Sequence, residues 1–351
     1  MEGIDEGPVS AWLEANVESL VPPFVYELVA GGRSNLTYRV SDAAGSDVVL
    51  RRPPAGHVLP TAHDMGREYR VVTALGPTSV PVPRTFGYCP DPEVTGAPFY
   101  VMEFVRGHIL RDAPTSEQVL DEAARRRAGE SLVDVLADLH DLDIDAVGLG
   151  DLGRREGYIA RQLERWHRQF GQSQVAGVDR PGDVDRVYEL LASSIPPQSW
   201  PAIVHGDYRL DNTMLADDGS VAAVLDWEIC TLGDPLADVG LLMVYWTERD
   251  DGFSALGPAP TSLPGFPTRA ELAERYSVRT RRDLSGLDFY VAFGYWKLAC
   301  ILQGVQARYA AGFGAGDRTG TETFGAQVRL LGAQALRTAE HLSSPTGRKQ
   351  R

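Results

Sequence analysis

The stretch His205-Gly206-Asp207-Tyr208-Arg209-Leu210-Asp211-Asn212, followed by Val224-Leu225-Asp226, decides how the rest of the chain is interpreted. It places Asp207 first, Asn212 five residues later and Asp226 fourteen residues after that. Phosphoryl transfer of the kinase type needs such a set, because one carboxylate holds the attacking hydroxyl while an amide and a second carboxylate hold Mg²⁺ on ATP. The spacing predicts a catalytic loop. The alternatives are a polar turn for Asp207 and Asn212, and a strand-end turn for Asp226.

The residues around this stretch agree with a strand, a loop and a helix in succession. The run from Val221 to Leu225 is apolar and would deliver Asp226 at the end of a strand. A helix is expected from Leu236 to Trp246, just after Asp234. Asp234 and Asp238 are expected to brace the loop and cap this helix, rather than to contact substrate.

Composition narrows the class of protein. The chain has 351 residues, an apolar fraction of 43% and a net charge of −14, which argues against general nucleic-acid or anionic-membrane binding. Cys89, Cys230 and Cys300 lack the spacing of a zinc site or a disulfide framework and are expected to be inert. The start of the chain lacks the pattern of a signal peptide, and its apolar runs are too short to cross a bilayer. We expect a cytoplasmic protein with no membrane partner.

The first hundred residues predict a small lobe rich in strands. Strands are expected at Phe24–Ala30, Leu36–Val40, Asp47–Arg52 and Phe99–Val105, and a helix capped by Thr61 at Thr61–Leu75. Helices dominate afterwards, at Glu122–His140, Tyr158–Phe170, Asp183–Ala192, Leu236–Trp246, Thr268–Tyr276, Gly286–Tyr309 and Thr323–Leu342. The pattern predicts a bilobal α+β protein with a small nucleotide-binding lobe at 1–105, a larger helical catalytic lobe at 106–342, and a disordered tail at 343–351.

The residues from 205 to 226 resemble those of the aminoglycoside phosphotransferase-like family, which shares the protein-kinase fold. The resemblance covers roughly residues 20 to 340 and is strongest from 201 to 246. It implies that Asp207 orients and deprotonates the acceptor hydroxyl, that Asn212 and Asp226 bind Mg²⁺ on ATP, and that His205 holds the loop by hydrogen bonding.

The resemblance also implies an ATP site in the small lobe. Gly31, Gly32, Ser34 and Asn35 lie where the kinase phosphate loop belongs, although a plain hairpin turn explains the same residues. Adenine is expected to pair with backbone groups near Glu103 to Val105.

The third strand departs from the family pattern, because residues 1 to 296 contain no lysine. Kinase-like enzymes place a lysine there, on the phosphates and paired with a glutamate. Here the strand offers Arg51 and Arg52, which alternate between its two faces. We expect Arg51 to face the phosphates with Glu68 as its partner, and a purely structural salt bridge is the alternative.

Two features bear on the acceptor. Asp234 follows Asp226 by only eight positions, and no Ala-Pro-Glu follows, which favours a small-molecule hydroxyl over a protein substrate. The stretches 50–56, 148–166 and 225–246 resemble the phosphotransferase domain associated with acyl-CoA dehydrogenases. That resemblance implies a hydroxyacyl substrate, as a hydroxy acid or as its CoA thioester.

Candidate substrate residues come from two further patterns. Arg161 and Arg165 lie with Arg168 on one face of an expected helix, just after Arg154 and Arg155, and could hold CoA phosphates; a solvated helix face is the alternative. The aromatic pairs Tyr245-Trp246 and Tyr295-Trp296 could line an acyl pocket, although aromatics at helical spacing are more often core residues.

Together these features predict an ATP- and Mg²⁺-dependent kinase for a small-molecule hydroxyl, with Asp207 as its base. The alternatives are a non-catalytic nucleotide- or ligand-binding module on a kinase fold, an aminoglycoside-type antibiotic kinase, and a protein kinase.

Overall fold

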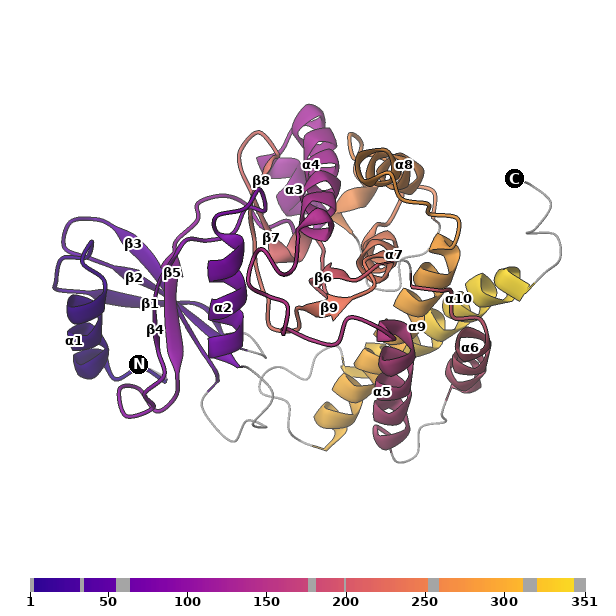
Figure 1. Cartoon of the computed structure of the whole chain (residues 1–351), viewed down its shortest axis with the longest axis horizontal. Coiled ribbons are helices and arrows are strands. Elements are labelled where there is room, and N and C mark those ends of the chain that lie inside the picture. Colours follow the sequence, from indigo (N-terminus) through magenta and orange to yellow (C-terminus); the bar gives the residue numbers. More distant parts are fainter. Residues whose placement is uncertain are drawn as a thin grey trace.

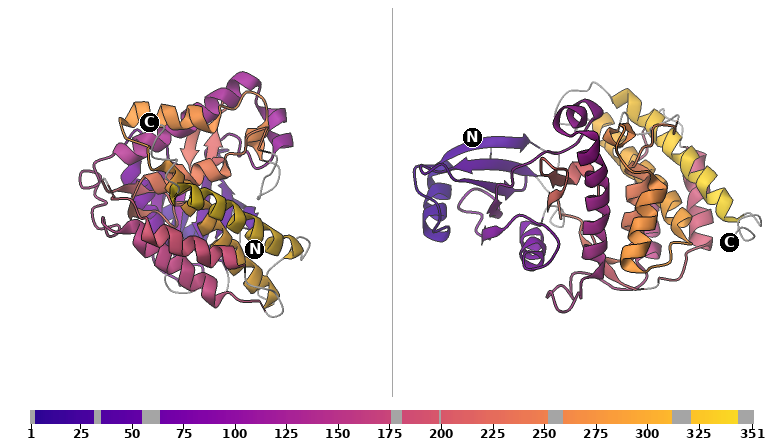
Figure 2. Two further views of the ribbon diagram at one scale, coloured as in Figure 1. Left: turned by 90° about the vertical axis from the view of Figure 1, so that its right-hand side faces the viewer. Right: turned by 90° about the horizontal axis from the view of Figure 1, so that it is seen from above.

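The computed structural model describes residues 3–31, 35–54, 64–175, 181–198, 200–251, 259–311 and 321–343. Its described residues form two lobes, a small one built on a sheet and a larger helical one, as predicted (Figure 1). The view from above in Figure 2 shows the sheet of the small lobe standing apart from the helices of the large lobe.

The small lobe contains a five-stranded antiparallel sheet with strand order β1-β2-β3-β5-β4. Its strands are β1 (Val25–Gly31), β2 (Leu36–Ser41), β3 (Asp47–Arg52), β4 (Thr85–Cys89) and β5 (Phe99–Glu103). Helix α1 (Glu6–Asn16) and helix α2 (Met65–Leu75) lie on either side of this sheet in Figure 1.

Side chains of β3 alternate between the face covered by α1 and the face covered by α2. Val48 and Leu50 are buried in one cluster with Leu13 of α1. Val49 belongs to another cluster, together with Met65 of α2. Because successive side chains point to opposite faces of a strand, Arg51 shares the face of Val49 and points toward α2.

The connector between the lobes is fixed by a close backbone contact. His108 and Leu215 exchange two backbone hydrogen bonds, of 2.8 and 2.9 Å. Gly107 precedes His108 with a φ of 153°, and a Cβ atom there would lie 2.3 Å from the Leu215 carbonyl oxygen. The close packing therefore requires glycine at this position.

The large lobe is mostly helical. Its α-helices are α3 (Ala113–Val119), α4 (Glu122–Asp141), α5 (Tyr158–Gln172), α6 (Gly182–Ser193), α7 (Leu236–Tyr245), α8 (Arg269–Thr280), α9 (Leu287–Ala310) and α10 (Thr321–Ser343). Two short ribbons carry the loop at 205–212 and its surroundings: β6 (Ala202–Val204) pairs with β9 (Thr231–Gly233), and β7 (Thr213–Leu215) pairs with β8 (Val221–Val224). The 3₁₀ turns are η1 (Leu210–Asn212) and η2 (Pro260–Ser262).

Helix α2 is attached to both lobes. Val71, Val72 and Leu75 are buried in the same apolar cluster as the core of the large lobe. The guanidinium of Arg67 donates to the carbonyl oxygens of Leu152 and Cys230, at 2.9 and 2.7 Å. Arg70 likewise donates to the Gly148 carbonyl oxygen at 2.8 Å. These contacts hold the helix that carries Glu68 against the large lobe.

Element boundaries differ from the prediction in a few places. Helix α2 begins at Met65 with Asp64 as its cap, because the Asp64 carboxylate accepts the Arg67 N–H at 3.0 Å; the predicted cap Thr61 lies outside the described residues. Strand β5 ends at Glu103, so Val105 lies in the connector. Ser343 of the predicted tail is the last residue of α10, and 344–351 lie outside the described residues.

Two predicted properties can be compared with the described residues. All three cysteines are buried free thiols. Among the described helices, none combines the length and apolarity that a bilayer span requires.

Candidate active site

The loop between β6 and η1 is held by the carboxylate of Asp238 on α7. One Asp238 oxygen accepts the His205 N–H at 2.7 Å, and the other accepts the Gly206 N–H at 2.9 Å. Asp234 instead accepts the Leu236 N–H at 3.1 Å at the start of α7. Of the two expected roles, Asp238 therefore braces the loop and Asp234 caps the helix.

His205 ties the loop to the strand that precedes Asp226. Its Nε2 atom lies 2.9 Å from the Leu225 carbonyl oxygen, and its Nδ1 atom accepts the Asp207 N–H at 3.3 Å. The side chain is fully buried, and its ring packs on Trp227 at 4.7 Å between centroids. These contacts match the loop-holding role inferred from the sequence.

Asn212 fixes the carboxylate of Asp207. Its Nδ2 atom donates to the Asp207 backbone oxygen at 2.8 Å and to the Asp207 Oδ2 atom at 3.0 Å. Because both amide hydrogens are used, the Oδ1 atom of Asn212 remains as its acceptor, which suits an oxygen-seeking cation.

Asp226 is brought close to Asn212 by the pairing of β7, which follows Asn212, with β8, which ends just before Asp226. The Leu225 N–H donates to the Asn212 carbonyl oxygen at 2.8 Å. Asp226 itself has a φ of +64°, which is uncommon for a residue other than glycine and concentrates at functional sites. No group of three or more His, Cys, Asp or Glu side chains in the described residues forms a metal cage. Asn212 and Asp226 fit Mg²⁺ nonetheless, because it usually binds one or two protein oxygens plus phosphates and water.

Arg51 connects the small lobe to Asp226. Its Nε atom lies 3.2 Å from Glu68, which is the predicted ion pair. Its NH2 atom pairs with the Asp226 Oδ1 atom. Burial lowers the pKa of Arg51, but the charges of Glu68 and Asp226 outweigh burial and the pKa is raised, so the guanidinium stays charged. Arg51 therefore lies beside Asp226, a candidate ligand of Mg²⁺.

Arg52 is held by hydrogen bonds inside the small lobe. It is buried on the opposite face of β3, and its NH1 atom donates to the Thr95 carbonyl oxygen at 2.6 Å and to the Thr95 hydroxyl at 3.2 Å. Arg51 therefore points toward Glu68 and Asp226, whereas Arg52 bonds within the small lobe.

The other candidates for nucleotide binding are only partly described. Gly31 ends β1, whereas Gly32 and Ser34 lie outside the described residues. The side chain of Asn35 is buried and donates to the Glu228 Oε2 atom at 3.2 Å. The Glu103 N–H donates to the Arg84 carbonyl oxygen at 2.7 Å, so this N–H is not free to pair with adenine.

Glu228 is a residue of the site that the sequence did not single out. It follows Asp226 by two positions and contacts Asn35 across the lobes. Burial, followed by the charge of Asp226, raises the pKa of Glu228 to about 7. In the sequence, the only indication of its role is its position two residues after Asp226.

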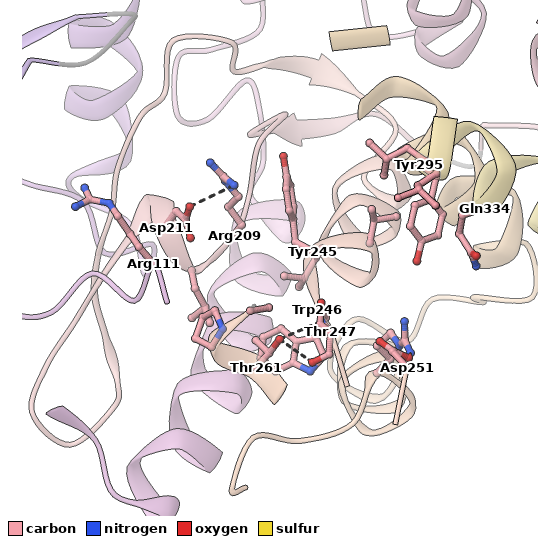
Figure 3. A pocket seen from close by; sticks show the side chains of 18 of the residues that line it. Arg111, Arg209, Asp211, Tyr245, Trp246, Thr247, Asp251, Thr261, Tyr295 and Gln334 are labelled. Carbon is pink, nitrogen blue, oxygen red and sulfur yellow. Dashed lines mark hydrogen bonds and ion pairs between the residues drawn. The ribbon is translucent and has the colours of Figure 1, made fainter. Parts of the chain in front are cut away.

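The large lobe contains a cavity of about 370 Å³ (Figure 3). Its wall includes Arg209 and Tyr245, and both contact the Asp207 carboxylate. The other charged side chains of its wall are Arg111, Asp211, Asp251, Arg269 and Arg337. A volume of this order suits a small molecule.

The arginines of this cavity differ in their partners. Arg209 lies 3.3 Å from Asp211, and Arg269 pairs with Asp251. Within the described part of the chain, no carboxylate forms an ion pair with Arg111 or Arg337. The cavity therefore offers positive charge that is not fully neutralised.

The predicted substrate residues divide into two groups. Trp246 lines the cavity, and its indole N–H donates to the Pro267 carbonyl oxygen at 2.8 Å. Trp296 does not line it: its side chain is fully buried in the core and its indole donates to Val184 at 2.9 Å, which corrects its assignment to a pocket. Arg161 and Arg165 lie on α5 and are not part of the cavity wall, and Arg161 instead donates to the Arg154 carbonyl oxygen at 2.9 Å.

Comparisons with known proteins place this site in a family. The Phosphotransferase enzyme family matches residues 25–289. Acyl-CoA dehydrogenase family member 11 of Gallus gallus is 35% identical over 324 residues, covering 90% of this chain and 40% of that protein. The chain spans only 26–40% of the length of the first curated relatives it matches.

Solved structures agree with this placement. A protein from Ralstonia eutropha JMP134, provisionally named an aminoglycoside phosphotransferase, is 32% identical with a TM-score of 0.81, over 96% of this chain and 98% of that one. A streptomycin–ATP complex of an aminoglycoside phosphotransferase shares the fold at 13% identity, with a TM-score of 0.58 over 86% of this chain and 91% of that one. The extent of these matches shows that the chain belongs to the Phosphotransferase enzyme family.

Proposed function

We propose that the protein is an ATP- and Mg²⁺-dependent kinase that phosphorylates the hydroxyl group of a small acidic molecule, a hydroxy acid or hydroxyacyl-CoA. The observation that carries the proposal is the set of partners of Asp207: one oxygen accepts from Asn212 and the other from Tyr245, a residue in the wall of an arginine-rich cavity. Asp207 would accept the proton of the acceptor hydroxyl while that oxygen forms a bond to the γ-phosphorus of ATP and the bond to ADP breaks.

The residues around ATP would neutralise and orient its phosphates. Arg51 is charged, is held by Glu68 and reaches Asp226, so it would replace the lysine of related enzymes. Asn212 and Asp226 would hold Mg²⁺, which supplies positive charge to the phosphates when bound.

The charges of the cavity favour an acidic acceptor over an aminoglycoside. Arg111, Arg209, Arg269 and Arg337 line it, against Asp211 and Asp251. A polycation would meet more positive than negative side chains there, whereas a carboxylate or phosphate would be attracted. The names of the curated relatives point to acyl compounds in the same way.

The test is phosphoryl transfer to the positional isomers of hydroxybutyrate and to their CoA thioesters, with kanamycin and casein as the alternative acceptors. Release of ADP and the mass of the phosphorylated product are measured for wild type, Asp207→Ala and Asp217→Ala. We expect transfer to an acid to require Mg²⁺ and to vanish in Asp207→Ala. Asp217→Ala removes an exposed carboxylate on the β7–β8 turn and should retain activity.

Other outcomes would favour other functions. ATP binding without transfer to any acceptor would favour the non-catalytic binding module. Transfer to kanamycin or casein alone would favour an antibiotic kinase or a protein kinase, respectively.

A further inference from the structure

Tyr245 occupies a position between the catalytic loop and the cavity. It is the last residue of α7 and stands beside Arg209 in Figure 3. Its hydroxyl donates to the Asp207 Oδ1 atom at 3.0 Å. Burial, followed by the charge of Asp207, raises the pKa of Tyr245 well above its ordinary value, so the phenol keeps its proton and acts as a donor at neutral pH.

The two oxygens of Asp207 thus have different donors. Oδ2 accepts from Asn212 at 3.0 Å, and Oδ1 accepts from Tyr245. Two donors on opposite oxygens fix the plane of a carboxylate, and each oxygen still has a lone pair for a further hydroxyl. Tyr245 lines the cavity, so its hydroxyl links Oδ1 directly to the cavity wall.

Arg209 is the third group at this carboxylate. Its Nε atom lies 3.6 Å from Asp207 Oδ2 and is buried without a hydrogen-bond partner among the described groups. Its guanidinium stacks over the Tyr245 ring, 4.7 Å from the centroid. A small rotation of the Asp207 carboxylate would let this N–H complete a charge-assisted bond, and a carboxylate paired in that way is a weaker base.

We propose that Tyr245 is a positioning residue for phosphoryl transfer: its hydroxyl keeps one oxygen of Asp207 directed at the acceptor, and its ring holds Arg209 at an ion-pair distance from that carboxylate that is too long for a hydrogen bond. This inference rests on the proposed kinase function. Tyr245 lies outside the loop motif and is not a candidate metal ligand. Its role would be to supply the hydroxyl that donates to Asp207.

The test separates the hydroxyl from the ring. Tyr245→Phe removes only the hydroxyl and keeps the surface on which Arg209 stacks, whereas Tyr245→Leu removes both. We expect kcat to fall about 10- to 100-fold in Tyr245→Phe, as for the loss of a hydrogen bond to a charged group, and further in Tyr245→Leu. KM for ATP should stay within about twofold, because Tyr245 contacts the base rather than the nucleotide candidates.

Tyr290→Phe is the matched control. The Tyr290 hydroxyl also donates to a buried carboxylate, that of Asp234, at 2.7 Å. Asp234 caps α7, however, and within the described part of the chain its side chain makes no hydrogen bond to the loop. It should keep wild-type kcat even if its melting temperature falls. A melting temperature measured for every variant removes those that fail to fold, and a low kcat in a variant that melts as wild type supports the proposal.

The outcomes distinguish this inference from the function on which it rests. Hydroxybutyrate isomers and their CoA thioesters serve as acceptors, and Asp207→Ala is measured in the same assay. Transfer that is absent in wild type, or that survives Asp207→Ala, overturns both proposals. Transfer that depends on Asp207 but has an unchanged kcat in Tyr245→Phe overturns the role of Tyr245 alone, as does an equal loss of kcat in Tyr290→Phe.

Discussion

The Nζ atom of Lys297 donates a hydrogen bond to the carbonyl oxygen of Gly206 at 2.8 Å, directly before Asp207. Lys297 lies on α9 and is 5% exposed. Burial lowers its pKa, and the charges of Asp207 and Asp238 oppose that effect. Since Asp238 accepts the Gly206 N–H, the residue before Asp207, the proposed base, is held at both ends by groups of opposite charge.

Lys297→Met should therefore weaken both the fold and catalysis. It leaves the buried Gly206 carbonyl without its donor, which costs about 1–3 kcal/mol of unfolding free energy. It should also lower kcat, because the loop before Asp207 gains freedom. Gln303→Met is a suitable control, since Gln303 is on the same helix and donates to the Ser173 carbonyl oxygen at 2.8 Å. Urea unfolding and turnover should show both variants less stable but only Lys297→Met slower; equal turnover would refute the role of Lys297.

Replacement of the two β3 arginines should separate nucleotide binding from stability. If Arg51 binds the phosphates as proposed, Arg51→Met should weaken ATP binding about 10- to 100-fold, since the charge-assisted bonds to phosphate would be lost. Arg52→Met should leave ATP affinity unchanged and lower stability, because Arg52 bonds to Thr95 inside the lobe. Titration calorimetry with Mg²⁺-ATP and urea unfolding measure the two quantities. Weaker ATP binding in Arg52→Met alone would reverse the assignment.

The acceptor site should respond to the arginines of the cavity. Arg111→Ala and Arg337→Ala should each raise KM for hydroxybutyrate severalfold and leave KM for ATP unchanged, because both cations line the cavity without an ion pair in the described residues. If the α5 arginines bind CoA phosphates, replacing Arg161 and Arg165 with alanine should raise KM for the CoA thioester but not for the free acid. Equal effects on the CoA thioester and on ATP would remove the α5 site.

The buried His140 should make stability depend on pH. Its ring lies 2.8 Å from the Tyr276 hydroxyl and 3.5 Å from Asp238. Burial lowers its pKa and outweighs the opposite effect of Asp238. Below the unfolded pKa of about 6.5 the unfolded chain binds a proton that the folded chain does not, so stability falls as pH decreases.

The comparison with His140→Gln isolates this effect from other titrating groups, such as Glu228. Between about pH 6.5 and pH 5, wild type should lose stability relative to the variant by up to about 1.4 kcal/mol per pH unit. Urea unfolding at several pH values measures the difference. A constant difference across that range would show that burial of His140 has no such cost.

Much of the site could be predicted because its residues are close in sequence. The loop from His205 to Asn212 and the strand before Asp226 form a local motif, and strand alternation separated Arg51 from Arg52. The ion pair of Arg51 with Glu68 was also expected, but its pairing with Asp226 is a tertiary contact that strand alternation does not report. The prediction that Trp296 lines a pocket was wrong, because aromatic residues at helical spacing fill a core as readily as a pocket.

Other features depend on contacts between distant segments. The strand β4 at Thr85–Cys89 was missed because it is short and follows Pro81-Val82-Pro83, and its pairing with β5 is not local. Helix α1 has a weak pattern and is defined by its packing on the sheet. Tyr245 reaches Asp207 only because α7 ends beside the catalytic loop, and no spacing in the sequence reports that meeting.

The attachment of α2 to both lobes has a consequence for unfolding. Its apolar face belongs to the core of the large lobe, and Arg67 bonds to two carbonyl oxygens there, while Met65 packs with the sheet. Neither lobe can melt without removing a surface on which the other depends. Calorimetry should therefore record one cooperative transition for the bilobal chain, rather than two separate ones.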